Sequence, residues 1–296
     1  MRQLSPRELA EALGVSESSL KRWVDAGKIV ATRTEGGHRR IPLPEAVRFI
    51  RETGAPLAHP EILDMPEVAI AQQRAVSGND RLLYYLRDGD VVGARGWLLA
   101  RYLGGASIAE MCDGPMRDAM ATLGEIWHHD DAGIFVEHRG TDVVLQSLAH
   151  LRNLFDPGPS APLAVGCAPE KDPYLLPSFM AATVLASVGT RAVNLGPDTP
   201  LVALRKAVEH HAPQLVWVSA SAALTPGRAQ AFAEWLSSLP STLITVVGGR
   251  ASDALTALVP TLRKVQSMTE LASVASELAR RPAHRGAGLE TVTPGG

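Results

Sequence analysis

The sequence predicts a multi-domain chain in which an all-α segment and a helical bundle precede a C-terminal α/β sheet domain. Its 296 residues are more than one hydrophobic core usually organises, so two or three domains are expected. Helical periodicity dominates residues 67–156, whereas strand-like apolar runs alternate with helical patterns over residues 160–281. The first pattern favours a bundle, and the second favours a parallel sheet covered by helices.

The composition is typical of a globular protein without a membrane segment. Hydrophobic residues make up 46% of the chain, and the formal net charge is -2. No apolar run approaches the length of a membrane span, and the stretch MRQLSPRELAEALG has no apolar signal-peptide core. The two cysteines, Cys112 and Cys167, lack metal-binding spacing and suit a reducing compartment. We therefore expect a cytoplasmic protein with no membrane partner.

The first segment, residues 1–54, begins with the pattern of two short helices. Ser5 stands where an N-cap is expected, with Pro6 at the first helical position and Glu8 at the capping-box position. Ser16 stands at the next N-cap. Two short helices joined by a tight glycine-containing turn make a helix-turn-helix.

A hairpin and a third helix follow in the same segment. Two extended arms around Glu35-Gly36-Gly37 predict a β-hairpin wing, and PLPEAVRFIRETG predicts an amphipathic helix. Residues 1–52 carry ten Lys and Arg against seven Asp and Glu. A locally basic end on a nearly neutral chain indicates a nucleic-acid partner.

This segment resembles the DNA-binding domain of the MerR family of transcription regulators, through LAEALGVSESSLKRWVDAGKI and GGHRRI. The resemblance implies a MerR-type winged helix-turn-helix that binds a double-stranded DNA operator, with one helix in the major groove and wing arginines on phosphates or in the minor groove. The alternative is a winged-helix domain that contacts proteins and has a solvated basic face. The expected DNA contacts are Ser18, Ser19, Lys21 and Arg22 on the helix and Arg33, Thr34, His38, Arg39 and Arg40 on the wing.

The middle of the chain predicts a linker and a bundle. Residues 55–66 contain three prolines and no helical period, which predicts a linker. Residues 67–156 are helical almost throughout, with breaks at SGND, DGD, LGGAS and HHDDAG. We expect a cap domain of four or five helices, the last beginning near Gly133.

The last segment predicts a doubly wound parallel sheet of the flavodoxin or Rossmann type. The apolar runs LAVGC, AVNLG, LVWVSA and TLITVVGG alternate with helical patterns near residues 175–188, 199–211 and 226–238. Ligands bind such sheets beyond the carboxyl ends of the strands. Residues 282–296 have no apolar periodicity, and a disordered tail is expected there.

Residues 160–281 resemble a cobalamin-binding domain. That family carries an Asp-x-His-x-x-Gly turn, then a Ser-x-Leu, then a Gly-Gly at set distances. Here Asp172-Pro-Tyr174-Leu-Leu-Pro177 takes the first place, Ser219-Ala-Ser221 follows after 41 intervening residues, and Gly248-Gly249 follows after a further 26. The resemblance implies that these positions bind a cofactor. Without it, the serines and glycines would only be small residues at strand ends.

The bundle segment WHHDDAGIFVEH resembles the cap of the photosensing MerR-type regulators of carotenoid genes, the CarH and LitR group. In that group the cap covers the upper face of adenosylcobalamin, and light breaks the cobalt–carbon bond. The resemblance implies that Trp127 lies over the adenosyl group, that Glu137 hydrogen-bonds it, and that His128 takes the upper cobalt position after photolysis. His138 belongs to the same set. The alternative is an ordinary bundle tryptophan followed by a polar loop and a solvated helix start.

The first turn departs from the cobalamin pattern at two positions. Tyr174 stands where a histidine binds cobalt from below, and Pro177 stands where glycine lets the turn approach the corrin. Neutral imidazole is a good cobalt ligand, whereas phenol ionises only near pH 10. Asp172, which holds that histidine from behind in the family, loses this task here. The alternative is a site that no longer binds a cofactor, with Tyr174 filling the space that the cofactor once occupied.

Three ligand states remain open at this point. One is adenosylcobalamin held by its upper face, without a protein histidine as lower ligand. Another is a different tetrapyrrole, either a bilin such as biliverdin or haem, with Tyr174 hydrogen-bonding pyrrole or propionate groups. The third is no ligand, so that the domain serves oligomerisation or makes a repressor controlled by an antirepressor protein.

Taken together, the segments predict a DNA-binding regulator rather than an enzyme. A tetrapyrrole between the bundle and the α/β domain would change the oligomer, a dimer or tetramer, that meets the operator, with light as the signal. A corrinoid methyltransferase module is the enzymatic alternative. The helix-turn-helix argues against it, and so does Tyr174, because such modules resemble one another in keeping the histidine.

Overall fold

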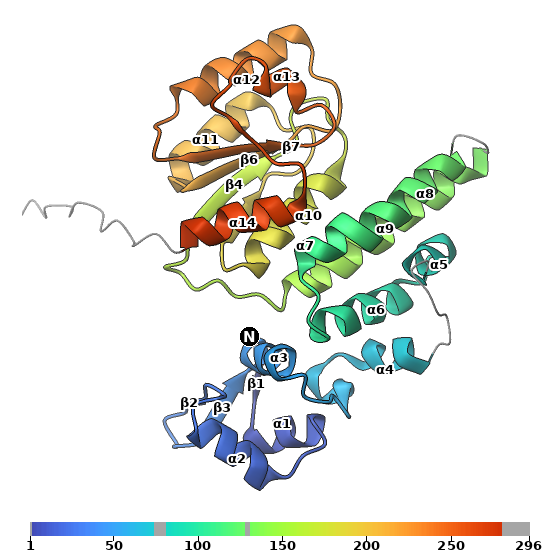
Figure 1. The fold of residues 1–296 in the computed structure, drawn as a ribbon, viewed down its shortest axis with the longest axis vertical. Coiled ribbons are helices and arrows are strands. Elements are labelled where there is room, and N and C mark those ends of the chain that lie inside the picture. Colours follow the sequence, from blue (N-terminus) through green and yellow to red (C-terminus); the bar gives the residue numbers. More distant parts are fainter. Residues whose placement is uncertain (1, 74–80, 128–130, 280–296) are drawn as a thin grey trace, which may run out of the picture.

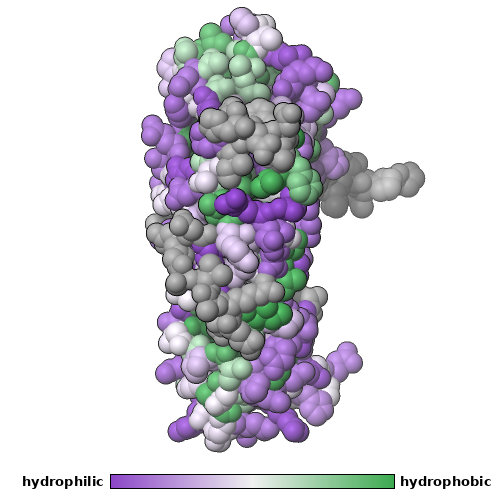
Figure 2. Space-filling view, turned by 90° about the vertical axis from the view of Figure 1, so that its right-hand side faces the viewer, coloured by the Kyte–Doolittle hydropathy of each residue, from purple (hydrophilic) through white to green (hydrophobic). Residues whose placement is uncertain are grey.

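The three expected parts of the chain are stacked along the long axis of the molecule in the computed structural model (Figure 1). The structure describes residues 2–73, 81–127 and 131–279. The helix-turn-helix part is at one end, the α/β part is at the other, and the helical bundle lies between them. Figure 2 shows the same narrow outline from the side, with hydrophobic and hydrophilic side chains interspersed on the visible face. The predicted tail, residues 282–296, lies outside the described residues.

The N-terminal part is a helix-turn-helix with a wing. Helices α1 (Pro6–Ala12) and α2 (Glu17–Asp25) precede the hairpin strands β2 (Thr32–Arg33) and β3 (Arg39–Pro42), and α3 (Leu43–Thr53) follows. The structure has the predicted caps: Glu8 N donates to Ser5 Oγ at 3.2 Å, and Ser5 N donates to Glu8 Oε2 at 2.7 Å. Strand β1 (Gln3–Leu4) was not expected, and it pairs with β3 to complete a three-stranded antiparallel sheet.

Residues 55–66 pack closely against the neighbouring parts, although their prolines predict a linker. They contain a short 3-10 helix, η1 (Pro60–Leu63). The amides of Ala58 and His59 both donate to the carbonyl oxygen of Ala12, at 2.9 and 3.0 Å. Leu63 and Met65 are buried in a hydrophobic core that continues from the helix-turn-helix into the bundle. The connection therefore fixes the two parts against each other.

The bundle consists of helices α4 (Pro66–Gln73), α5 (Arg81–Asp88), α6 (Val91–Leu103), α7 (Ile108–Met111), α8 (Arg117–Trp127) and α9 (Asp131–Arg152). The predicted breaks at DGD and LGGAS separate α5 from α6 and α6 from α7, whereas SGND and the residues 128–130 of HHDDAG lie outside the described residues. Helix α9 begins two residues before the expected Gly133. Helices α7 and α8 are one helix interrupted by the π-helical turn η2 (Cys112–Met116), which contains Pro115. Proline lacks the amide and clashes with the preceding turn, so a wider turn accommodates it.

The α/β part confirms the predicted doubly wound parallel sheet. The strands are β4 (Leu163–Cys167), β5 (Arg191–Asn194), β6 (Leu215–Ser219), β7 (Ile244–Gly248) and β8 (Arg263–Lys264), all parallel, in the order β5-β4-β6-β7-β8. Helices α10 (Leu175–Ser187) and α14 (Met268–Ala279) contribute to one buried layer, and α11 (Leu201–His211), α12 (Pro226–Ser238) and α13 (Asp253–Thr256) contribute to the other. Because both faces are covered, the central strands β4 and β6 are buried along their whole length and are almost entirely apolar, whereas the edge strands β5 and β8 carry polar residues.

A buried charged cluster joins three helices of the bundle. Glu67 of α4 is 6% exposed, and its Oε1 lies 3.6 Å from Arg95 Nη1 of α6 and 3.4 Å from His150 Nε2 of α9. Burial lowers the pKa of His150, and the neighbouring Arg95 lowers it further against the opposing effect of Glu67. Folding therefore favours the neutral imidazole.

This cluster makes stability depend on pH. Since the folded pKa of His150 is lowered, its contribution is fully present above the unfolded pKa of about 6.5 and is lost as pH falls through the folded value. We expect the free energy of unfolding to fall more between pH 7.5 and pH 5.5 in the wild type than in His150→Gln. Urea unfolding at the two pH values measures this, and equal losses in both proteins would contradict it.

In the part of the chain that the structure describes, no helix has both the length and the apolar character needed to cross a membrane.

Candidate functional site

A cavity of about 770 Å³ lies between the bundle and the carboxyl edge of the parallel sheet. Side chains of η2, α8 and α9 line it from the bundle, and the ends of β6 and β7, the start of α10 and the start of α14 line it from the α/β part. Sheet edges of this kind and interfaces between domains are where small molecules bind, and the volume lies in the range of small-molecule sites. The predicted residues that line this cavity are Glu137, His138, Tyr174, Ser219, Ser221, Gly248 and Gly249.

Asp172 has a structural task that the sequence did not reveal. Its side chain is 1% exposed and lies in the turn after β4. Its carboxylate accepts hydrogen bonds from the backbone amides of Tyr174 at 3.1 Å, Ser221 at 2.5 Å and Ala222 at 2.9 Å. Asp172 therefore joins the turn after β4 to the turn after β6, and it lies behind the cavity lining although it was predicted among the cofactor-binding residues.

Tyr174 and Pro177 lie at the start of α10. Tyr174 is the N-cap residue, and its side chain is 48% exposed at the cavity. Pro177 is the third residue of the helix, where a backbone amide has no partner within the helix, so proline causes no break. Arg250 Cζ lies 5.5 Å from the centroid of the Tyr174 ring. The turn that departs from the cobalamin pattern thus presents an aromatic ring, and the Arg250 guanidinium from the turn after β7 lies over that ring.

The strand ends after β6 and β7 are joined by their backbones. Ala220 N donates to Gly248 O, and Ala251 N donates to Ala220 O, both at 2.8 Å. Gly249 has a φ of 99°, and a Cβ there would lie 2.3 Å from Ala220 O. Glycine is required at this position by both its conformation and its close neighbour. The two turns form one rigid rim of the cavity.

The bundle side places Glu137 and His138 at the cavity. Glu137 Oε1 accepts a hydrogen bond from Thr141 Oγ1 at 3.1 Å, and His138 Nε2 lies 3.5 Å from Glu137 Oε2. Trp127 is the last residue of α8, and its side chain is outside what the structure describes. His128 lies outside the described residues, so its role as an upper cobalt ligand stays a prediction.

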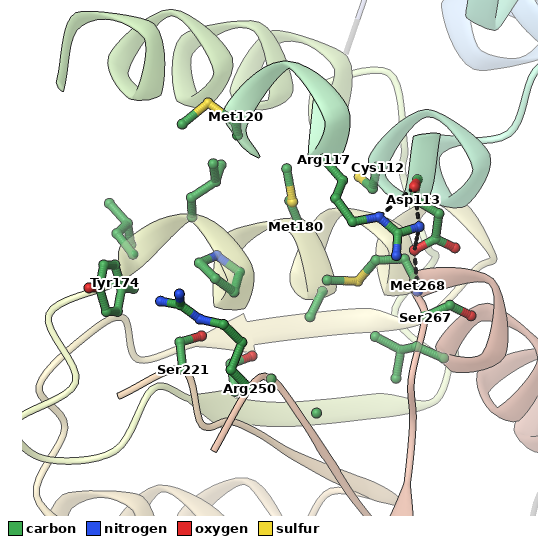
Figure 3. Close-up of a pocket in the computed structure, with 18 of the residues that line it drawn as sticks. Cys112, Asp113, Arg117, Met120, Tyr174, Met180, Ser221, Arg250, Ser267 and Met268 are labelled. Carbon is green, nitrogen blue, oxygen red and sulfur yellow. Dashed lines mark hydrogen bonds and ion pairs between the residues drawn. The ribbon is translucent and has the colours of Figure 1, made fainter. Parts of the chain in front are cut away.

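Several cavity-lining residues were not predicted from the sequence, because only the fold brings them to the cavity. Asp113 of η2 accepts hydrogen bonds from the amides of Met268 and Thr269, at 2.8 and 2.9 Å, at the start of α14. Arg117 Nε donates to Asp113 O at 2.7 Å. Figure 3 shows Tyr174, Ser221 and Arg250 at one end of the cavity and Arg117, Asp113 and Met268 at the other, with Met180 between. The adjacency of Arg250 to Gly248-Gly249 was the one available sequence signal.

Both cysteines are buried, and Cys112 is the one that lines the cavity. Burial raises the pKa of the Cys112 thiol to about 12, and nearby Asp113 adds to the rise. Burial likewise raises the pKa of Cys167 to about 12. Both therefore stay protonated at neutral pH, and a protonated thiol is neither a nucleophile nor a metal ligand. Over residues 2–73, 81–127 and 131–279, no group of three or more His, Cys, Asp or Glu side chains is arranged to hold a metal ion.

A second candidate surface is formed by α2 and the wing. Ser18, Lys21, Arg22, Arg33, Thr34 and His38 are exposed, and Ser19, Arg39 and Arg40 are partly exposed. Arg39 Nη2 lies 2.7 Å from Asp25 Oδ1, so Arg39 ties the wing to the end of α2. Ser19 Oγ accepts from Arg22 Nη2 at 3.2 Å. Trp23 packs on Phe49 with ring centroids 5.1 Å apart, which leaves the polar residues on the outer face.

A helix-turn-helix domain matches residues 4–52. The chain is also similar in structure to a monomethylamine corrinoid protein from Methanosarcina barkeri (17% identity, TM-score 0.49, covering 67% of this chain and 97% of that one). It is similar to the methanol:cobalamin methyltransferase complex from the same organism (14%, TM-score 0.38, covering 72% and 89%). A novel cobalamin-binding protein from Desulfitobacterium hafniense DCB-2 is a further neighbour (14%, TM-score 0.36, covering 68% and 98%). No curated protein matches the chain in sequence. These likenesses do not assign a ligand or an activity to this chain.

Proposed function

We propose that this chain is a MerR-type transcriptional regulator that binds DNA through its helix-turn-helix and senses a tetrapyrrole in the cavity between bundle and sheet. One observation carries the proposal: a single interrupted helix connects the cavity to the helix-turn-helix. Its π-helical turn and α8 line the cavity through Cys112, Asp113, Arg117 and Met120. Its N-terminal end, α7, follows the loop after α6, and α3 of the helix-turn-helix part is hydrogen-bonded to that loop.

Arg51 of α3 makes these hydrogen bonds. Its Nη1 donates to the carbonyl oxygens of Tyr102 and, at 2.9 Å, Ala106, and its Nη2 donates to Gly105 O at 3.3 Å. The guanidinium carbon also lies 3.8 Å from the Tyr102 ring centroid. The helix starts two residues after Ala106, at Ile108. A ligand that moves η2 or α8 would therefore act on α3 through a short, packed connection.

The helix-turn-helix supports DNA binding, with exposed cations on both α2 and the wing. We expect Arg22→Ala or Arg40→Ala to weaken binding roughly tenfold and to reduce the salt slope by about 1 for each DNA phosphate that is no longer neutralised. Fluorescence anisotropy on a duplex selected by the wild-type protein from random sequence measures both quantities. Lys206→Ala on α11, which is exposed and remote from the helix-turn-helix, is the matched control. Unchanged affinity and slope in both wing and helix variants would contradict the DNA surface.

The cavity suits a flat, mostly apolar ligand with polar groups at its edge. Met120, Met180 and Trp217 line its apolar part, and polarisable sulfur packs well on extended π systems. A corrin whose cobalt is held from below by the protein does not fit, because Tyr174 stands at that position and a phenol is a poor ligand at neutral pH. The proposed ligand is therefore adenosylcobalamin held by its upper face alone, or a bilin such as biliverdin, or haem.

The proposed output is a change of assembly. Ligand held between η2, α9 and the sheet edge biases the packing of bundle against α/β part, and this sets how a dimer or tetramer presents its helix-turn-helix units to a symmetric operator. Light is the proposed trigger, acting on the bound chromophore. The resemblance of WHHDDAGIFVEH to photosensing caps supports this step.

An absorption spectrum of the protein purified from cells supplied with cobalamin, with biliverdin or with haem tests the ligand. A corrin spectrum, a red-absorbing bilin band or a Soret band identifies it. No visible absorbance under any supply contradicts the tetrapyrrole proposal and favours a ligand-free repressor controlled by a protein partner. Gel shift and size-exclusion chromatography in dark and light then test the trigger, and identical results in both contradict light sensing.

A further inference from the structure

Arg250 is a cation at the cavity whose hydrogen-bond donors point to no polar group among the described residues. It follows Gly248-Gly249 directly, its side chain lines the cavity, and the residue is exposed. Its guanidinium contacts the Tyr174 ring, and within the described residues it has no ion pair or hydrogen bond. Figure 3 shows the side chain extending from the rim toward Tyr174. The positive φ of Gly249 turns the chain at this point and aims Arg250 at the cavity.

Other charged groups at the cavity already have partners. Arg117 Nη2 lies 3.9 Å from Asp113 Oδ1, and Asp113 also accepts the amides at the start of α14. Glu137 is hydrogen-bonded by Thr141 and lies beside His138. Among the described residues that line the cavity, Arg250 is thus the arginine with no hydrogen bond or ion pair to the protein, so that all of its donors are available to a ligand. Its five N–H groups form a planar fork that matches a carboxylate with two parallel hydrogen bonds.

Resting on the proposed function, we propose that Arg250, together with the Tyr174 hydroxyl, binds a carboxylate side chain of the tetrapyrrole. The ligand then carries free acid groups, as the propionates of a bilin or of haem do. A corrin whose ring side chains are amides offers no such group. Tyr174 is in this account a ligand-binding residue: its ring supports the guanidinium by a cation–π contact, and its hydroxyl donates to the same carboxylate.

The test compares an acid with its ester in the full-length protein. Biliverdin and biliverdin dimethyl ester share the same conjugated tetrapyrrole, and the ester replaces the two propionate charges by neutral methyl esters, while hemin is the metal-containing acid. Binding to wild type, Arg250→Gln and Arg250→Lys is followed by absorbance titration in the dark. Arg205→Gln on α11, an exposed arginine outside the cavity lining, is the matched control. Circular dichroism of each variant confirms folding.

We expect Arg250→Gln to weaken binding of the acid about 10- to 100-fold, as for loss of a hydrogen-bonded charged partner, with Arg250→Lys between the two and Arg205→Gln unchanged. The ester should bind wild type and Arg250→Gln alike. The acid whose affinity falls in Arg250→Gln, either biliverdin or hemin, identifies the class of tetrapyrrole that the cavity binds. If an acid binds but Arg250→Gln binds it equally, or the ester binds as tightly as the acid, the assignment of Arg250 is overturned while the tetrapyrrole site stands. If biliverdin, hemin and adenosylcobalamin all fail to bind, the proposed function and this assignment fall together.

Discussion

Asp172→Asn is expected to lower the free energy of unfolding by about 2–4 kcal/mol and to abolish ligand binding. The carboxylate is buried and accepts three backbone amides from two turns. Asparagine keeps the shape but replaces one acceptor oxygen by an amide that donates. A backbone N–H of Ser221, Ala222 or Tyr174 then faces another donor, and the buried donor left without a partner is costly.

Asp198→Asn is the matched control for this variant. Asp198 Oδ1 accepts the amide of Lys171 at 2.6 Å, near the same turn, but the residue is exposed. Asparagine retains that acceptor and tolerates the left-handed conformation that Asp198 adopts at φ 49°. Chemical unfolding measures the free energy of unfolding of both variants, and ligand titration measures their affinity for the ligand. An Asp172→Asn protein as stable as Asp198→Asn would show that the carboxylate does not join the turns.

Gly249→Ala is expected to cost roughly 2–6 kcal/mol and to distort the rim that presents Arg250. The backbone φ of 99° is strained for any residue with a Cβ, and the added atom would lie 2.3 Å from Ala220 O. That oxygen is fixed, because it accepts Ala251 N while Ala220 N donates to Gly248 O. Since the clash is with backbone, no side chain can move aside to relieve it.

Gly248→Ala is the control one residue away. A Cβ there would meet Val265 Cγ2 at 3.2 Å and Val265 O at 3.3 Å, and the backbone conformation is ordinary, so we expect a loss of roughly 1 kcal/mol. Thermal and urea unfolding compare the pair. Equal stability of Gly248→Ala and Gly249→Ala would contradict the structure of this rim.

Local sequence signals predicted most of the fold. Ser5, Glu8 and Ser16 mark helix starts because a cap acts within three residues, and the structure shows those hydrogen bonds. The alternation of apolar runs predicted the parallel sheet, because buried strands need continuous hydrophobicity. Strand β8 (Arg263–Lys264) is too short and too polar for such a signal.

The candidate site could be predicted only where its residues belong to a local sequence motif, either after a strand or in the stretch WHHDDAGIFVEH. Tyr174, Ser219 and Gly249 were predicted from the resemblance to the cobalamin-binding motifs, and the fold brings them to one cavity because the carboxyl ends of parallel strands share an edge. Asp113 contacts α14 across 155 residues of sequence, and no local pattern encodes that pairing. The hydrophobic core shared by the helix-turn-helix and the bundle could not be predicted for the same reason. The prolines in residues 55–66 predict a linker whether or not the segment packs against its neighbours.

The proposed function requires that the cavity and the DNA-binding surface are energetically coupled. The most direct measurement is the affinity of the full-length protein for its selected duplex, at fixed salt, without ligand and saturated with whichever tetrapyrrole the absorption experiment identifies. The affinities of the two states are expected to differ at least about fivefold, which is the lower end of ordinary allosteric coupling. Equal DNA affinities with the cavity demonstrably filled would contradict it.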